Sequence, residues 1–77
     1  MNDKVLELLA QILQIDIAHI TDNTKMKDVE TWDSLKHMEI IASLEQAFGV
    51  EFTFEEIVSM QSIGQIKHVL IQKGVTG

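Results

Sequence analysis

A fifteen-residue segment from Ser34 to Phe48 constrains the fold more than any other part of the sequence. It follows Asp33, contains neither proline nor glycine, and stops at Gly49, a residue type that commonly ends helices. At about 100° per residue, its apolar side chains fall on two opposite stripes of a helix. The first stripe contains Ile40, Ile41, Leu44, Ala47 and Phe48, and the second contains Leu35, Met38 and Ala42. This pattern predicts a long helix with one stripe in a core and the other largely exposed.

The N-terminal part of the chain predicts one more helix and a long connection. Apolar residues recur at i, i+3, i+4 and i+7 from Val5, which predicts an amphipathic helix over residues 3–15, capped by Asn2 or Asp3. Residues 16–32 then form a long loop, in which the polar residues 21–24 predict a turn. The helix is expected to bury Val5, Leu8, Leu9 and Ile12. The loop is expected to contain one short helical turn and to be pinned by Ile17, Ile20, Met26 and Val29.

Two capping signals mark the C-terminal part. Thr53 and Ser62 are each followed three residues later by Glu or Gln, the pattern of a capping box. The first predicts a short helix that buries Phe54, Ile57 and Val58. The second predicts a helix that ends near Lys73 and buries Ile63, Ile66 and Leu70; Gly64 in its first turn allows a close approach of a helix or loop. The predicted fold is therefore all-α, a small four-helix bundle of three main helices, one short helix and a long first loop.

Length and composition limit the class of protein. The chain has 77 residues, enough for one small domain spanning residues 1–77, and no cysteine, so a core of aliphatic side chains must supply its stability. The absence of cysteine fits a reducing cytosol. The first helical segment is interrupted by polar residues and has no basic start, which argues against a signal peptide and a membrane span. We expect a monomeric, cytoplasmic protein that does not contact a membrane.

The distribution of charge points to protein partners. The net charge is −6, which disfavours binding to nucleic acid phosphates. Residues 28–56 hold eight acidic residues and one lysine, so the acid is concentrated around the long helix. Such a run is ordinarily a solvated face, but it also suits docking to basic partners.

Ser34 has three interpretations on local sequence. The simplest is an N-cap of the long helix. A hydrolase nucleophile paired with His37 is disfavoured, because no G-x-S-x-G motif surrounds the serine and a small bundle offers no deep cleft. A metal site is also disfavoured, because no two histidines have the i,i+4 spacing. We expect His37 to be a half-buried packing residue. We expect Trp32 to anchor the end of the loop. The third interpretation is a site of covalent attachment.

The second apolar stripe supports that third interpretation. Its residues are aligned, begin beside Ser34 and are flanked by Glu39 and Glu45. An apolar centre with a charged rim is typical of a small protein interface, and methionine suits a surface that fits several partners.

Asp33-Ser34-Leu35, followed by Met38-Glu39-Ile40-Ile41, Leu44-Glu45 and Phe48, resembles the acyl carrier proteins. The similarity continues through Glu51-Phe52 and Glu55-Glu56 to the segment from Ile63 to Leu70, so it spans essentially the whole chain. It implies that Ser34 accepts 4′-phosphopantetheine from coenzyme A, through a separate phosphopantetheinyl transferase, with Asp33 and Leu35 beside the attachment point. The arm would carry acyl groups as thioesters between enzymes, and the protein itself would catalyse nothing.

The resemblance also implies a docking surface and partners. Docking residues would be Leu35, Met38, Glu39, Ala42, Glu45, Glu55, Glu56 and Met60. The partners would be the transferase and acyl-transferring, condensing or ligase enzymes with basic patches, in fatty-acid, polyketide or related synthesis. Lys36, His37, Gln46 and Trp32 depart from the common fatty-acid form and indicate a specialised, free-standing carrier. An aminoacyl, peptidyl or D-alanyl carrier and a non-covalent acidic interaction domain remain alternatives.

Overall fold

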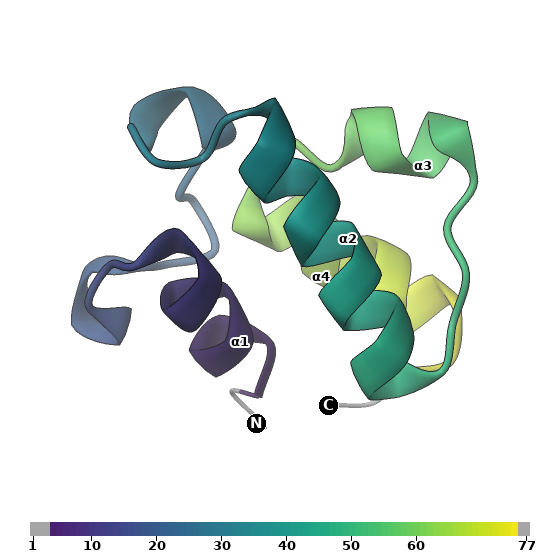
Figure 1. Ribbon diagram of the computed structural model, residues 1–77. Helices are drawn as coiled ribbons and strands as arrows, with labels where there is room; N and C mark the ends of the chain where they lie inside the picture. The colour runs from purple at the N-terminus through teal and green to yellow at the C-terminus, as the bar shows by residue number, and fades with distance from the viewer. Residues whose placement is uncertain (1–3, 76–77) are drawn as a thin grey trace.

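The computed structural model describes residues 4–75, which form four α-helices and two short 3₁₀ turns. The helices are α1 (Lys4–Leu13), α2 (Ser34–Phe48), α3 (Phe54–Ser59) and α4 (Ile63–Gln72), and the turns are η1 (Ile17–His19) and η2 (Met26–Asp28). In Figure 1, α2 crosses the molecule diagonally, with α1 on one side and the short α3 on the other. The predicted all-α, four-helix architecture is confirmed.

The core lies between α1, α2 and α4. On α2 it takes Ile40, Ile41 and Leu44 from the predicted inner stripe, whereas Ala47 is exposed and Phe48 only half-buried. On α4 the predicted residues are buried and Val69 joins them. The buried apolar residues are Val5, Leu9, Ala10, Leu13, Ile20, Trp32, Ile40, Ile41, Leu44, Met60, Ile63, Ile66, Val69 and Leu70.

Helix α1 is shorter than expected and turns a slightly different face inward. It ends at Leu13 because Gln14 adopts a positive φ of 59°, the left-handed conformation that ends helices. Leu13 and Ala10 are buried in the core, while Leu8 and Ile12 are only half-buried. The proposed caps Asn2 and Asp3 lie outside the described residues.

The long loop contains two helical turns where one was expected. Asp16 begins η1 by accepting a hydrogen bond from the N–H of Ala18 at 2.9 Å. Of the four expected pins, Ile20 is buried, Met26 and Val29 are partly buried against the core, and Ile17 is exposed. The loop is therefore fixed mainly by Ile20 and by its contacts with α4.

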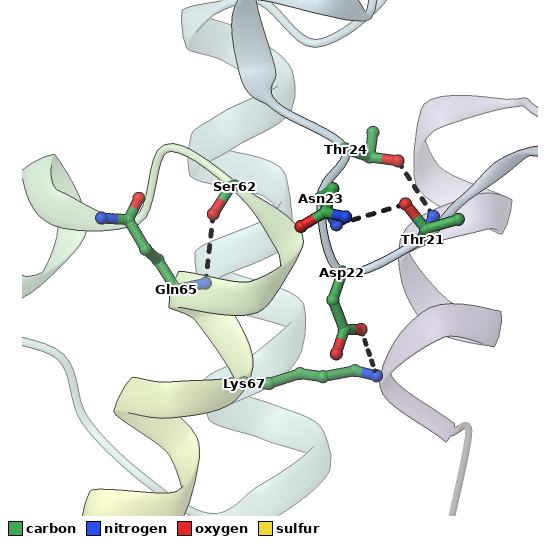
Figure 2. Close-up of polar contacts among 7 residues, drawn as sticks. All are labelled: Thr21, Asp22, Asn23, Thr24, Ser62, Gln65 and Lys67. Atoms are coloured by element: carbon green, nitrogen blue, oxygen red, sulfur yellow. Dashed lines mark hydrogen bonds and ion pairs between the residues drawn. The ribbon is translucent and has the colours of Figure 1, made fainter.

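The turn at residues 21–24 is bonded to the start of α4 (Figure 2). The side chain of Asp22 points to α4 and its Oδ1 lies 2.8 Å from the Nζ of Lys67. The N–H of Gly64 donates to the carbonyl of Asp22 at 2.9 Å, and a Cβ at Gly64 would stand 3.0 Å from that oxygen. The close loop approach that Gly64 was expected to allow is confirmed.

One of the two predicted capping boxes is complete. The Thr53 hydroxyl accepts from the N–H of Glu56, and the Glu56 carboxylate accepts from the N–H of Thr53. Ser62 caps α4 by accepting from the N–H of Gln65 (Figure 2). The second predicted capping box is therefore only half formed. Its reciprocal bond was predicted wrongly, because the Gln65 side chain accepts from the N–H of Gln61 rather than that of Ser62.

The predicted inner face of α3 is also wrong. Phe54 is 79% exposed and Val58 is 51% exposed, and only Ile57 of the expected three packs against the core. Helix α3 has six residues, fewer than two turns, so a single side of it can reach the bundle. That side carries Ile57, and the buried Met60 follows directly after the helix.

Candidate functional site

The start of α2 is built by Asp33 and not by Ser34. Asp33 has an extended backbone, with φ −99° and ψ −172°, and its Oδ1 accepts a hydrogen bond from the N–H of Lys36 at 2.9 Å. Asp33 is therefore the N-cap, and Ser34 is the first residue inside the helix. The interpretation of Ser34 as a plain N-cap is wrong, because the preceding carboxylate already fills that role.

This arrangement leaves the Ser34 side chain available for chemistry. Ser34 is exposed, and within residues 4–75 no group forms a hydrogen bond with its hydroxyl. The first N–H groups of a helix have no partners within it, and here only that of Lys36 is capped by a side chain. The N-terminus of α2 can thus stabilise a phosphodiester on Ser34, through free N–H groups and the helix dipole.

Trp32 and His37 lie on either side of Ser34 in sequence, and their side chains are hydrogen-bonded to each other. Trp32 is 3% exposed, which confirms the expected loop anchor, and its Nε1–H donates to Nδ1 of His37 at 3.1 Å. Because indole is only a donor, His37 must accept at Nδ1 and carry its proton on Nε2. That Nε2–H donates to the backbone carbonyl of Ile57 in α3 at 2.8 Å. His37, at 7% exposed, is more deeply buried than expected.

The same hydrogen bonds argue against the hydrolase interpretation. A serine nucleophile needs a base whose free nitrogen can take the proton of the hydroxyl. Both ring nitrogens of His37 are engaged elsewhere, one by Trp32 and one by Ile57. The geometry therefore provides Ser34 with no histidine base from its own helix.

The outer stripe of α2 is exposed as predicted. Leu35 is 82% exposed, Met38 is 52% exposed, and Ala42 is also exposed. Glu39 lies in the same segment, and its carboxylate is 3.5 Å from the Nζ of Lys36. Leu35, Met38 and Ala42 share one side of α2 by their helical spacing, and Leu35 directly follows Ser34 in the sequence. The use of this stripe in docking stays a prediction.

Three of the expected docking residues have other roles. Met60 is 0% exposed and belongs to the core, so its assignment to a docking surface is wrong. Glu45 is partly buried and accepts from the N–H of Phe52 at 2.9 Å, which ties α2 to the segment before α3. The Glu56 carboxylate accepts from Lys73 at 2.9 Å and caps α3. The Lys73 hydrogen bond and the Thr53 N–H together hold the pKa of Glu56 below its usual value.

Sequence reasoning missed two exposed apolar side chains on α3. Phe54 and Val58 are four residues apart, so they share one side of the helix, and that side faces solvent. The signal that could have revealed them is the short spacing from the Thr53 cap to the Ser62 cap. Eight residues lie between the two caps, and those that form the turn into the next helix leave room for few buried positions on a helix.

The structure adds two further observations. Within residues 4–75, no group of three or more histidine, aspartate or glutamate side chains is placed to hold a metal ion. No helix in the described part of the chain is long and apolar enough to cross a bilayer.

Comparisons with known proteins agree with this geometry. The family described as "Phosphopantetheine attachment site" matches residues 3–70. The chain is 33% identical over 72 residues to polyketide-8 synthase acyl carrier protein 2 of Streptomyces avermitilis, covering 92% of this chain and 82% of that protein. It is 28% identical to the solution structure of holo acyl carrier protein from Geobacter metallireducens, with a TM-score of 0.82 over 92% of this chain and 82% of the other.

A solved structure from Mycobacterium tuberculosis shares the fold, with a TM-score of 0.84 at 24% identity over 92% of this chain and 95% of that one. The family match and the Streptomyces relative both cover most of the sequence, and the Ser34 environment fits a phosphate-linked group. The chain therefore belongs to the phosphopantetheine-attachment family and is an acyl carrier protein whose prosthetic group is 4′-phosphopantetheine.

Proposed function

We propose that Ser34 is the residue that bears the 4′-phosphopantetheine arm. The observation that carries this proposal is the exposed, unbonded hydroxyl at the first position of α2, with the capping role taken by Asp33. Of the other serines, Ser59 donates its hydroxyl to the carbonyl of Glu56, Ser62 caps α4, and Ser43 is only partly exposed in the middle of α2.

The reaction transfers the phosphopantetheinyl group of coenzyme A to the Ser34 hydroxyl. The Ser34 oxygen bonds to the phosphorus that carries the pantetheine, and the bond from that phosphorus to 3′,5′-ADP breaks. The proton of the hydroxyl leaves to a base of the transferase, because His37 is engaged elsewhere. The free N–H groups at the start of α2 then face the new phosphodiester.

The thiol at the end of the arm carries acyl groups as thioesters, and this chain acts as the carrier and not as the catalyst. Its partners are a phosphopantetheinyl transferase and acyl-transferring enzymes with basic docking patches. We call Leu35, Met38, Glu39 and Ala42 the α2 docking face; Glu55, Phe54 and Val58 on α3 add one acid and two apolar groups that partners can use. A Streptomyces relative named for a polyketide synthase supports polyketide synthesis as the pathway.

Intact mass tests the attachment. Incubation with coenzyme A and a broad-specificity transferase is expected to add the mass of one phosphopantetheine to the wild-type protein. Ser34→Ala is expected to gain nothing, whereas the matched control Ser59→Ala is expected to be modified like the wild type. Modification of Ser34→Ala, or no mass gain on the folded wild type, would overturn the proposal. Loading the modified protein with malonyl and with aminoacyl groups then separates a polyketide carrier from an aminoacyl carrier.

A further inference from the structure

We propose that Trp32 and His37 form a bracket that holds Ser34 in position for group transfer and couples it to α3. This proposal rests on Ser34 as the attachment residue. Trp32 precedes Ser34 by two residues and His37 follows it by three, and their side chains are hydrogen-bonded at 3.1 Å. The ring centroids are 6.1 Å apart with an interplanar angle of 30°. The two side chains therefore close a loop of chain in which Asp33, Ser34 and Leu35 are exposed.

The bracket fixes where α2 begins relative to the preceding loop. The neighbouring Thr31 hydroxyl donates to the carbonyl of Leu13 at 2.7 Å, and the N–H of Trp32 donates to the carbonyl of Val29 at 3.0 Å. The segment before Ser34 is thus tied to α1 and to itself. The Trp32–His37 hydrogen bond ties it to the second turn of α2. Without that bond, fraying of the first turn would move the Ser34 hydroxyl.

The other nitrogen of His37 reaches α3. Its Nε2–H donates at 2.8 Å to the carbonyl of Ile57, one of the last carbonyls of α3, which also accepts from the N–H of Met60 at 3.3 Å. The last carbonyls of a helix have no partners within it, so His37 serves as a donor at the C-terminal end of α3.

Helix α3 depends on such bonds more than the other helices do. None of its six residues is fully buried. Its N-terminal side is held by the Glu56–Lys73 ion pair and by the bond from Phe52 to Glu45, and its C-terminal end by His37 and the buried Met60. An element with few buried apolar groups opens at low cost. A displacement of α3 is therefore transmitted by one imidazole to the segment that carries Ser34.

Kinetics of phosphopantetheine transfer test the positioning role. His37→Leu keeps an apolar body and removes both hydrogen bonds, and we expect kcat for transfer to Ser34 to fall about five- to tenfold, the usual effect of losing a buried hydrogen bond or two. KM is expected to stay close to the wild-type value, because the α2 docking face is unchanged. His37→Gln, whose amide can accept from Trp32 and donate to Ile57, is expected to restore most of kcat. His68→Gln, an exposed histidine on α4, is the matched control.

Amide hydrogen exchange tests the coupling. Trp32→Phe keeps a buried aromatic ring but removes the indole N–H and part of the ring volume, and Trp32 forms no hydrogen bond with α3 in the described structure. Coupling through His37 predicts faster exchange at the N–H of Met60 in this variant, with little change at core amides of α4. If His37→Leu does not fold, the kcat and the amide exchange of Trp32→Phe test both the positioning of Ser34 and its coupling to α3.

The outcomes separate this proposal from the previous one. A wild-type protein that is not modified contradicts the role of Ser34 itself. Normal modification of wild type together with a wild-type kcat in His37→Leu and Trp32→Phe overturns the bracket alone. A uniform rise in exchange at all amides, with no rescue by His37→Gln, also overturns it, because the pair would then contribute only to global stability.

Discussion

At the residue scale, two adjacent polar side chains at the start of α2 have different roles. Asp33 and Ser34 are both residue types that cap helices, and either could begin α2 from the sequence alone. The structure gives the cap to Asp33, whose carboxylate bonds the N–H of Lys36, and leaves the Ser34 hydroxyl exposed. Removal of the Asp33 side chain should therefore lower the free energy of unfolding more than removal of the Ser34 side chain.

Removing each side chain in turn tests this division. Asp33→Ala is expected to lower the free energy of unfolding by about 1 kcal/mol, the usual cost of losing an N-cap. Ser34→Ala is expected to change it by less than about 0.5 kcal/mol, because no hydrogen bond is lost. Urea denaturation measures both values. A larger loss for Ser34→Ala than for Asp33→Ala would return the capping role to the serine.

Two methionines show what residue type alone cannot decide. Met38 is half-exposed on the outer stripe of α2, whereas Met60 is 0% exposed. Met60→Ala is expected to cost about 2–5 kcal/mol in the free energy of unfolding, because it leaves a cavity in the core. Met38→Ala is expected to cost about 0.5 kcal/mol and to raise the transferase KM about fivefold. Equal losses of stability in the two variants would show that the outer stripe is not exposed.

At the element scale, the helices differ in how far the sequence determines them. Helix α2 was predicted with its bounds, because fifteen residues give the apolar period four turns to repeat and Asp33 and Gly49 mark its ends. Its outer stripe and the buried residues Ile40, Ile41 and Leu44 of its inner stripe followed from the same period, whereas the predicted burial of Ala47 was wrong. Six residues give α3 no such repeat, so the burial of Phe54 and Val58 depended on which neighbours cover them, and that prediction was wrong.

The polar contacts of α3 were equally beyond the sequence. The cap at Thr53 is local and was predicted, but the Glu56–Lys73 pair joins residues seventeen positions apart. The bond between His37 and Ile57 joins α2 to α3 and depends on the packing of both helices. Such contacts depend on the tertiary structure, and the periodicity of the sequence does not predict them.

The ion pair on α3 makes stability depend on pH. The bonds from Lys73 and Thr53 hold the pKa of Glu56 below its ordinary value of 4.5. Because the folded pKa is depressed, this stabilisation is present above pH 4.5 and is lost as the pH falls through the folded pKa. Glu56→Gln, which keeps the cap, is expected to show a shallower loss of unfolding free energy below pH 4.5 than wild type.

The neighbouring acid supplies the control for that measurement. Glu55 is exposed on the same helix. We expect Glu55→Gln to follow the wild-type pH dependence in denaturant titrations. If both variants lose the same part of the pH dependence, the effect comes from overall charge and not from the Lys73 contact.

At the scale of the whole molecule, the bundle holds the exposed Ser34 at the start of α2. The core of α1, α2 and α4 fixes the direction of α2, the loop is bonded to the start of α4, and α3 is attached by polar contacts. Ser34 stands at the end of α2 where the loop, α2 and α3 are linked through Trp32 and His37. The net charge of −6 and the exposed stripe beside Ser34 suit recognition by basic enzymes.

The most direct test of the central claim is to locate the arm on the modified protein. Cleavage after Lys27 and Lys36 gives a peptide of residues 28–36 in which Ser34 is the one serine, with Thr31 as the other hydroxyl. Fragment masses of that peptide, taken after reaction with coenzyme A and a transferase, assign the added group to a single residue. We predict one phosphopantetheine on Ser34. An arm on Thr31, or on a peptide that carries Ser43, Ser59 or Ser62, would contradict it.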